Sequence, residues 1–232
     1  MREEQQMEKK TEAKQIHLDQ VLPGQIEAKS FEIIGQELQE MGIRLKPEEE
    51  LVIKRAIHAS ADFDYAQNLV FSPEAVGAGL EAIRKGCHIV TDTRMAWSGI
   101  NKGRLSAFGG EAITFMSDED VAEAARQAGS TRAAASMEKA AALYGAGGRL
   151  ERTPCIFAVG NAPTALIRLY ELVQESKLRP ALIIAMPVGF VNVVQSKELI
   201  LSLKKTPFIV ARGRKGGSNI AAAVCNALIY QA

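Results

Sequence analysis

Two stretches of this 232-residue sequence combine residue types that could bind or protonate a ligand. In the first, Arg55, His58 and Asp62 are spaced by three and four residues, so they share one face if a single helix carries all three. A cation, an imidazole and a carboxylate in a row could transfer protons, because imidazole titrates near neutral pH. The alternative is that Arg55 and Asp62 are surface partners and that Asp62 only caps the helix that follows.

The second stretch is the basic, glycine-rich segment Gly213-Arg214-Lys215-Gly216-Gly217-Ser218-Asn219. Glycines let backbone N–H groups approach an anion, and the helix predicted to follow offers its N-terminus. Together with Arg212, the segment carries three cations in four positions, which suits a carboxylate or a phosphate. It predicts an anion-binding loop, and the alternative is a solvated turn that happens to be basic.

Other candidate residues are less specific. Asp92 follows a predicted strand, where it could line a cleft or cap a helix. Asn161 lies in Gly160-Asn161-Ala162-Pro163-Thr164, which could bind a ligand or simply start a helix. The sequence contains no P-loop, and its glycine-rich segments do not form a dinucleotide fingerprint. Three widely spaced cysteines predict neither a disulfide framework nor a metal site, and we expect neither a metal nor a cofactor.

Short apolar runs that alternate with amphipathic stretches should position these residues. The runs predict strands at residues 87–90, 112–115, 155–159, 181–185 and 208–210. Before them, helices are expected over residues 47–59, over 63–70 behind an Asp62 cap, and from 72 to 86. The expected fold is α/β: one domain with a mostly parallel central sheet, helices on both faces and a helical N-terminal third.

The loops that follow the predicted strands contain most of the candidate residues. They comprise residues 91–94, 160–163, 187–190 and 213–219. In parallel sheets, ligands bind where the carboxyl ends of the strands meet. We therefore expect these four loops to converge at one edge of the sheet and to form the site there.

Composition restricts the class of protein. The formal net charge of +1 gives no global field that would recruit nucleic acid or an anionic membrane. The N-terminal region has no apolar stretch of signal-peptide type, and the longest apolar run is too short and too interrupted to span a bilayer. The expectation is a cytoplasmic protein with a polar tail over residues 1–25 and a single domain over 26–232.

Several long motifs resemble those of the precorrin-8X methylmutases, and specifically their cobalt-precorrin-8 branch. The resemblance runs from about residue 26 to residue 230. It is carried by Ser30-Phe31-Glu32-Ile33-Ile34, Lys54-Arg55-Ala56-Ile57-His58, Thr91-Asp92-Thr93, Gly160-Asn161-Ala162-Pro163-Thr164, Pro187-Val188-Gly189-Phe190-Val191 and the segment at 213–219. One departure is Gln195, which precedes Ser196-Lys197 where the family usually has glutamate.

This resemblance implies a homodimeric isomerase of cobalamin biosynthesis, with a tetrapyrrole substrate whose methyl group moves from carbon 11 to carbon 12. It implies that His58 is the catalytic acid and that Ser30 and Arg55 bind the substrate. We expect Asp92 and Asn161 to bind the substrate, and its acidic arms to be held by the loop residues Arg212, Arg214, Lys215, Gly216, Gly217 and Ser218. The alternative is a non-catalytic corrinoid carrier that uses the same loops.

Overall fold

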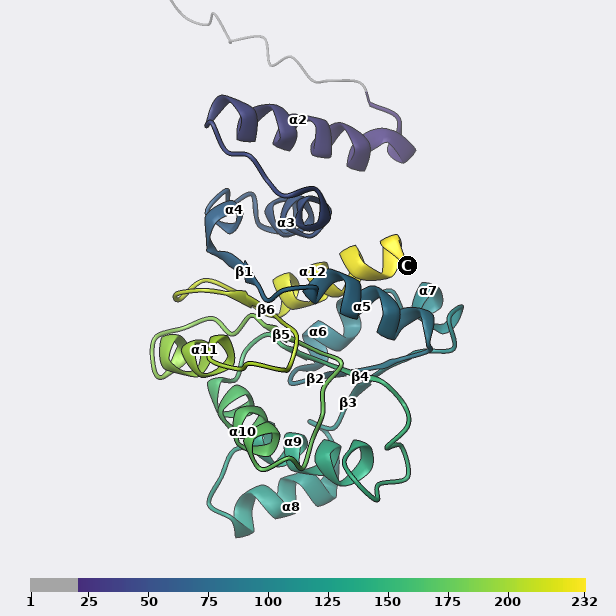
Figure 1. Ribbon diagram of the computed structural model, residues 1–232, viewed down its shortest axis with the longest axis vertical. Helices are drawn as coiled ribbons and strands as arrows, with labels where there is room; N and C mark the ends of the chain where they lie inside the picture. The colour runs from purple at the N-terminus through teal and green to yellow at the C-terminus, as the bar shows by residue number, and fades with distance from the viewer. Residues whose placement is uncertain (1–20) are drawn as a thin grey trace, which may run out of the picture.

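A computed structural model describes residues 21–232, which are built around one six-stranded sheet. The strand order is β1-β6-β5-β4-β2-β3, and all neighbours are parallel except β1 against β6 (Figure 1). The strands are β1 (Leu69–Phe71), β2 (His88–Thr91), β3 (Glu111–Thr114), β4 (Cys155–Val159), β5 (Leu182–Ala185) and β6 (Phe208–Ala211). The expected α/β class and the five predicted strands are confirmed, each strand to within one residue at either end.

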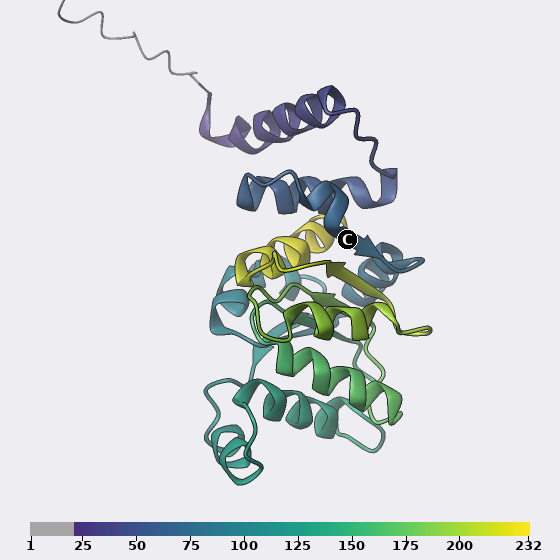
Figure 2. The ribbon, with the colours of Figure 1, turned by 90° about the vertical axis from the view of Figure 1, so that its left-hand side faces the viewer.

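Helices cover both faces of this sheet (Figures 1 and 2). One face carries α5 (Ala75–Arg84), α6 (Arg94–Gly99), α7 (Lys102–Ser106) and α12 (Ser218–Gln231). The other carries α9 (Arg132–Tyr144), α10 (Pro163–Gln174) and α11 (Val193–Leu201), with α8 (Glu119–Gln127) packed on α9. Each layer buries its own apolar core against alternate residues of the strands, as the two-residue period of a strand requires.

The N-terminal helices extend the first layer outward. Helix α3 (Pro47–Ser60) packs on α12, and α2 (Ile26–Glu40), preceded by a 3₁₀ turn at Pro23–Gln25, packs on α3. Both views show α2, α3 and α12 stacked in that order above the sheet (Figures 1 and 2). Helix α12 therefore lies between the sheet and α3, which explains why it is apolar nearly all round.

The predicted helix over residues 63–70 is confirmed only over its middle and is wrong at both ends. Helix α4 (Tyr65–Asn68) is a single turn, and the chain then forms β1, which pairs antiparallel with the edge of β6. The strand contains a β-branched valine and an aromatic phenylalanine, and it gains a ladder of hydrogen bonds at an otherwise open edge. Most of the tail predicted for residues 1–25 lies outside the described residues.

No helix within residues 21–232 has the length and apolar character needed to cross a bilayer.

Candidate active site

The four loops at the carboxyl ends of the parallel strands meet, as the sequence predicted. The hydroxyls of Thr93 and Ser218 lie 2.8 Å apart, which joins the β2 exit to the start of α12. The N–H of Gly217 donates to the carbonyl oxygen of Met186 at 2.7 Å, which joins the loop before α12 to the β5 exit. A Cβ on Gly160 would lie only 2.6 Å from the Cα of Ser218, so the β4 exit reaches α12 only because residue 160 has no side chain.

Asp92 holds the loop that follows β4 in place. Its carboxylate is 1% exposed and accepts the N–H groups of Gly160, Asn161 and Ala162 at 2.7, 2.9 and 2.7 Å. Burial raises the pKa of Asp92, and the three N–H donors oppose that rise. Both carboxylate oxygens are used inside the chain, so Asp92 shapes the loop that holds Asn161. Its predicted direct contact with a substrate stays a prediction.

The three loop cations do not act as one cluster. Arg212 forms a two-bond ion pair with Glu198, at 2.9 and 3.1 Å. The guanidinium of Arg214 lies 5.3 Å from the ring centre of Phe190. Among the described residues, Arg214 is the one member of the three without a carboxylate partner. This corrects the prediction that all three cations are free to bind one anion.

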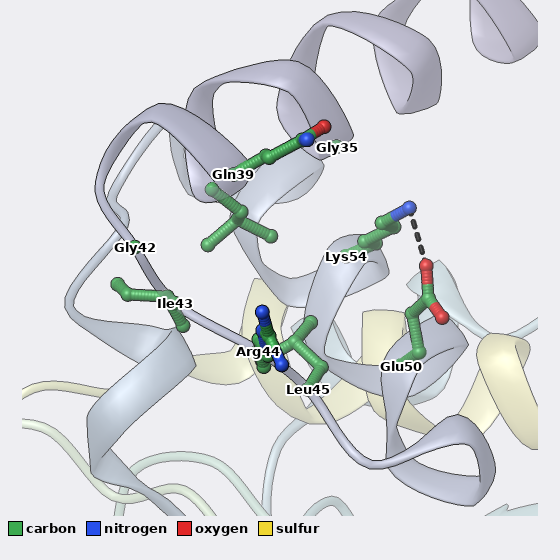
Figure 3. Close-up of a pocket in the computed structure, with 9 residues that line it drawn as sticks. Gly35, Gln39, Gly42, Ile43, Arg44, Leu45, Glu50 and Lys54 are labelled. Atoms are coloured by element: carbon green, nitrogen blue, oxygen red, sulfur yellow. Dashed lines mark ion pairs between the residues drawn. The ribbon is translucent and has the colours of Figure 1, made fainter.

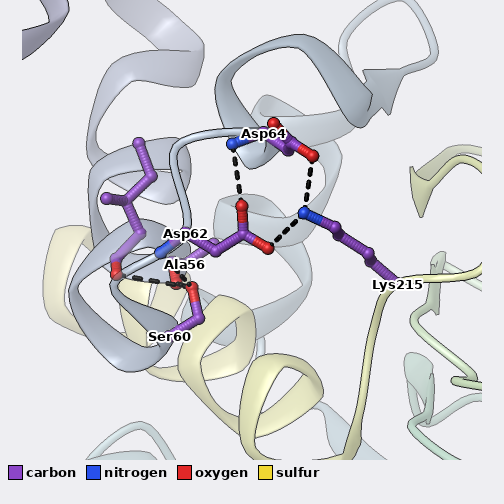
Figure 4. Close-up of polar contacts among 6 residues, drawn as sticks. Ala56, Ser60, Asp62, Asp64 and Lys215 are labelled. Carbon is purple, nitrogen blue, oxygen red and sulfur yellow. Dashed lines mark hydrogen bonds and ion pairs between the residues drawn. The ribbon is translucent and has the colours of Figure 1, made fainter.

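Lys215 connects the glycine-rich loop to the segment that follows α3. Its ammonium lies 2.6 Å from Asp62 Oδ2 and 2.5 Å from Asp64 Oδ2 (Figure 4). The hydrogen bond from Lys215 lowers the pKa of Asp62 against the opposing effect of desolvation, and the two carboxylates raise the pKa of Lys215. We call this group of Lys215, Asp62 and Asp64 the latch.

The condition under which Asp62 would share a helix face with Arg55 and His58 is not met. Ala61 adopts left-handed backbone angles (φ 54°) and ends α3 one residue before Asp62. Asp62 therefore turns toward Lys215, and its Oδ1 accepts the N–H of Asp64 at 3.0 Å. It does not cap α4, whose N-cap side chain makes no capping bond.

His58 lies exposed on the last turn of α3, next to the start of α12. The side-chain amide of Asn219 reaches the carbonyl oxygen of the neighbouring Ala59 at 3.5 Å. On the other side, the ring of Phe31 from α2 meets the imidazole edge-on, with centroids 5.7 Å apart. The imidazole thus contacts α2, and the residue that follows it contacts the first turn of α12.

Arg55 lies one turn before His58 and is held by three groups. Its guanidinium forms a two-bond pair with Glu27 at 2.6 and 2.8 Å and lies over the rings of Phe31 and Tyr230. The hydrogen bonds from Arg55 are the main reason why the pKa of Glu27 is lowered. Arg55 Nε is buried without a hydrogen-bond partner in the described part of the chain.

Ser30 lies three residues after Glu27 on α2, on the side of the helix from which Glu27 reaches Arg55. Its hydroxyl donates to the carbonyl oxygen of Ile26 at 2.9 Å. The hydroxyl keeps its lone pairs for a ligand, because that bond uses only the donor. Of the three residues singled out by the family resemblance, the structure brings Arg55 and His58 together on the ring of Phe31, and Ser30 precedes that ring on α2.

A hollow of about 610 Å³ lies at the exits of β2, β3 and β4, and the sequence predicted only part of its lining. Asn161 lines it, as do two arginines, Arg94 and Arg132, that form no ion pair among the described residues. Arg132 was not among the residues predicted from the sequence. The signal was Thr131, which caps α9 by accepting the N–H of Ala134 and so places Arg132 at the start of that helix.

A second cavity, of about 690 Å³, lies between α2 and α3 near the turn that joins them (Figure 3). Its wall includes Gln39, Ile43 and Arg44, together with Lys54 paired to Glu50 at 2.5 Å. The cavity contains none of the candidate site residues.

Comparison with known proteins decides the family. The family model described as precorrin-8X methylmutase matches residues 25–231. The chain belongs to the precorrin-8X methylmutase family. It is 43% identical to the cobalt-precorrin-8 methylmutase of Priestia megaterium, over 90% of this chain and 88% of that one. It is also 43% identical to the protein of that name from Salmonella typhimurium, over 90% of this chain and 95% of that one.

A solved structure agrees with this membership. The precorrin-8X methylmutase of Thermus thermophilus superimposes with a TM-score of 0.76 at 40% identity, covering 89% of this chain and 96% of that one. The region matched by the methylmutase family model begins just before α2 and ends within α12. It therefore includes every element that carries a candidate site residue.

Proposed function

We propose that this chain is an isomerase of cobalamin biosynthesis that moves a methyl group from carbon 11 to carbon 12 of a precorrin-8 ring. The family match over residues 25–231 carries the proposal. The contacts of Arg55 and His58 with the ring of Phe31, and the contact of Ala59 with the first turn of α12, support it. We favour the cobalt-bearing substrate, because the relatives at 43% identity have that name.

His58 is the proposed proton donor. A methyl shift of this kind rearranges bonds within one molecule, so the ring gains and loses no atoms overall. Protonation by the His58 imidazolium makes the conjugated ring more electrophilic at the carbon that receives the methyl group. The rearranged ring then loses a proton, and imidazole is suited to take it back.

The loops are the proposed binding site for the acidic arms of the ring. Arg214 has no carboxylate partner among residues 21–232, and the first turn of α12 leaves backbone N–H groups without intrahelical partners. The hollow lined by Asn161, Arg94 and Arg132 offers two more cations at the same edge. Rigid binding of the ring is itself catalytic, because correct positioning lowers the barrier.

We also propose that the chain acts as a homodimer. The exposed apolar side chains of Ile26 and Ile33 on α2, and of Leu51 on α3, support this, because such side chains are suited to meeting a second copy. Light scattering coupled to gel filtration should give twice the chain mass. A monomer at micromolar concentration would contradict the dimer and leave the chemistry untouched.

The decisive experiment for the function is incubation with cobalt-precorrin-8 and, separately, with metal-free precorrin-8. Conversion should change the visible spectrum of the ring, because its conjugation changes, while the mass of the ring stays the same. Tight binding of both forms without any conversion would overturn the enzyme and favour a corrinoid carrier.

A further inference from the structure

Lys197 is a buried lysine directly behind the glycine-rich loop. It lies on α11, its exposed fraction is 0%, and its ammonium donates to the carbonyl oxygens of Gly213 at 2.9 Å and of Lys215 at 2.7 Å. No carboxylate in the described part of the chain pairs with it. Burying an ammonium costs free energy. The hydrogen bonds to two loop carbonyls offset part of that cost for Lys197.

Three consecutive carbonyls of the loop are in fact held by the segment that follows β5. Lys197 takes those of Gly213 and Lys215, and the N–H of Gly189 donates to that of Arg214 at 3.3 Å. The loop has little freedom to move inward, because a Cβ on Gly216 would lie 2.2 Å from the carbonyl oxygen of Met186.

This backbone arrangement fixes where the loop side chains go. With the carbonyls of residues 213–215 committed to the β5–α11 segment, Arg214 lies against Phe190 and Lys215 reaches the latch carboxylates. Lys197 thereby sets the position of Arg214, the loop cation without a carboxylate partner, and of the start of α12.

We propose that Lys197 is the positioning residue of the carboxylate-binding loop, holding residues 213–217 in the shape that receives an acidic arm of the substrate. The proposal rests on the proposed function for the identity of that substrate. Lys197 acts through the loop, so its loss should weaken binding of the ring more than it slows the chemical step.

The test compares Lys197→Met, Lys197→Gln and Lys197→Arg, with Lys204→Met as the control because Lys204 is an exposed lysine beyond the end of α11. For Lys197→Met we expect KM and the Kd for the ring to rise about tenfold or more, the effect of losing charged hydrogen bonds, with kcat changed much less. Lys197→Arg keeps the charge and the donors and should recover most of the affinity. Lys204→Met should match the wild type.

A second readout does not depend on catalysis. Trypsin cuts after Arg214 and Lys215, and a loop released by Lys197→Met should be cut there several-fold faster than in the wild type or in Lys204→Met. If the wild type neither binds nor converts the ring, the proposed function fails, while the cleavage rates still test Lys197. The inference is overturned if every folded variant matches the wild type in both readouts. It is also overturned if none of the three substitutions folds, because Lys197 would then be a residue of the core alone.

Discussion

At the scale of single residues, the guanidinium of Arg55 is already occupied. Glu27 binds it through two oxygens, in the geometry that a substrate carboxylate would use. Glu27 is more than half exposed and lies at the start of α2, so a substrate arm could replace it without disturbing the core. Glu27 thus competes with the substrate for Arg55, which the family resemblance assigns to substrate binding.

Replacing Glu27 by Gln should therefore tighten binding of the ring by several-fold, because the substrate no longer displaces a charged partner. Titration of the ring spectrum with enzyme measures the change. Glu32→Gln is the matched control, since Glu32 lies on the same helix and, within residues 21–232, pairs only with Lys29 and Gln36. Weaker binding by Glu27→Gln would mean instead that Glu27 holds Arg55 in its working position.

Lys197 should also change how stability depends on pH. Burial lowers its pKa to about 8, below the ordinary lysine value of 10.5. Between these two values the unfolded chain binds more protons than the folded chain, so the free energy of unfolding should rise with pH. Below pH 8 both states are protonated, and this contribution should be flat.

Urea unfolding between pH 7 and pH 10 checks this prediction. The wild type should gain stability relative to Lys197→Met above pH 8, by on the order of 1 kcal/mol per pH unit. A constant difference between the two proteins across this range would show that the lysine is not desolvated.

At the scale of elements, the site joins two layers of the molecule. His58 belongs to the α2–α3 stack, whereas the loops belong to the sheet. The latch and the contact between Asn219 and Ala59 connect the two at this point. The position of the imidazole relative to the loops therefore depends on these polar contacts as well as on the apolar packing of α3 against α12.

The double substitution Asp62→Asn with Asp64→Asn should lower kcat/KM several-fold and leave the melting temperature nearly unchanged. Exposed ion pairs contribute little to stability, but these hold the segment after His58 to the loop. Steady-state kinetics and thermal unfolding measure the two quantities. Glu198→Gln, which breaks the Arg212 pair on the same loop, should leave kcat/KM close to that of the wild type. Equal losses of kcat/KM in both proteins would show that the latch does not position His58.

Elements with a strong local signal could be predicted from the sequence. The runs Cys155–Val159 and Phe208–Ala211 are apolar throughout, because they are covered on both faces, and the convergence of the loops follows from a parallel sheet. Strand β1 could not be predicted this way, since three residues become a strand only by pairing with β6. The helix end before Asp62 depends on the left-handed angles of Ala61, a residue type that gives no such signal.

The site was predictable in its residues but not in their partners. The carboxylates that occupy Lys215 are more than 150 positions away in the sequence, so only the fold reveals them. Lys197 looks in the sequence like an ordinary exposed helix lysine. Its role depends on loop carbonyls 16 and 18 residues further along the chain.

At the scale of the whole molecule, the candidate site is open and bounded by groups that suit a large, flat, acidic ring. The β5 exit presents Phe190 and Val191, each 79% exposed, beside Arg214. The hollow with Arg94 and Arg132 lies at the same edge of the sheet. Apolar surface for the ring and cations for its arms thus occur together, as a tetrapyrrole requires.

The most direct test combines the chemistry of His58 with the binding function of the loops. Wild type and His58→Ala are each incubated with cobalt-precorrin-8, and both ring binding and the visible spectrum are followed. The wild type should convert the ring. His58→Ala should bind it with similar affinity and convert it about 100- to 10,000-fold more slowly, the usual contribution of a general acid. Conversion by His58→Ala at the wild-type rate would contradict the assignment of this imidazole as the proton donor.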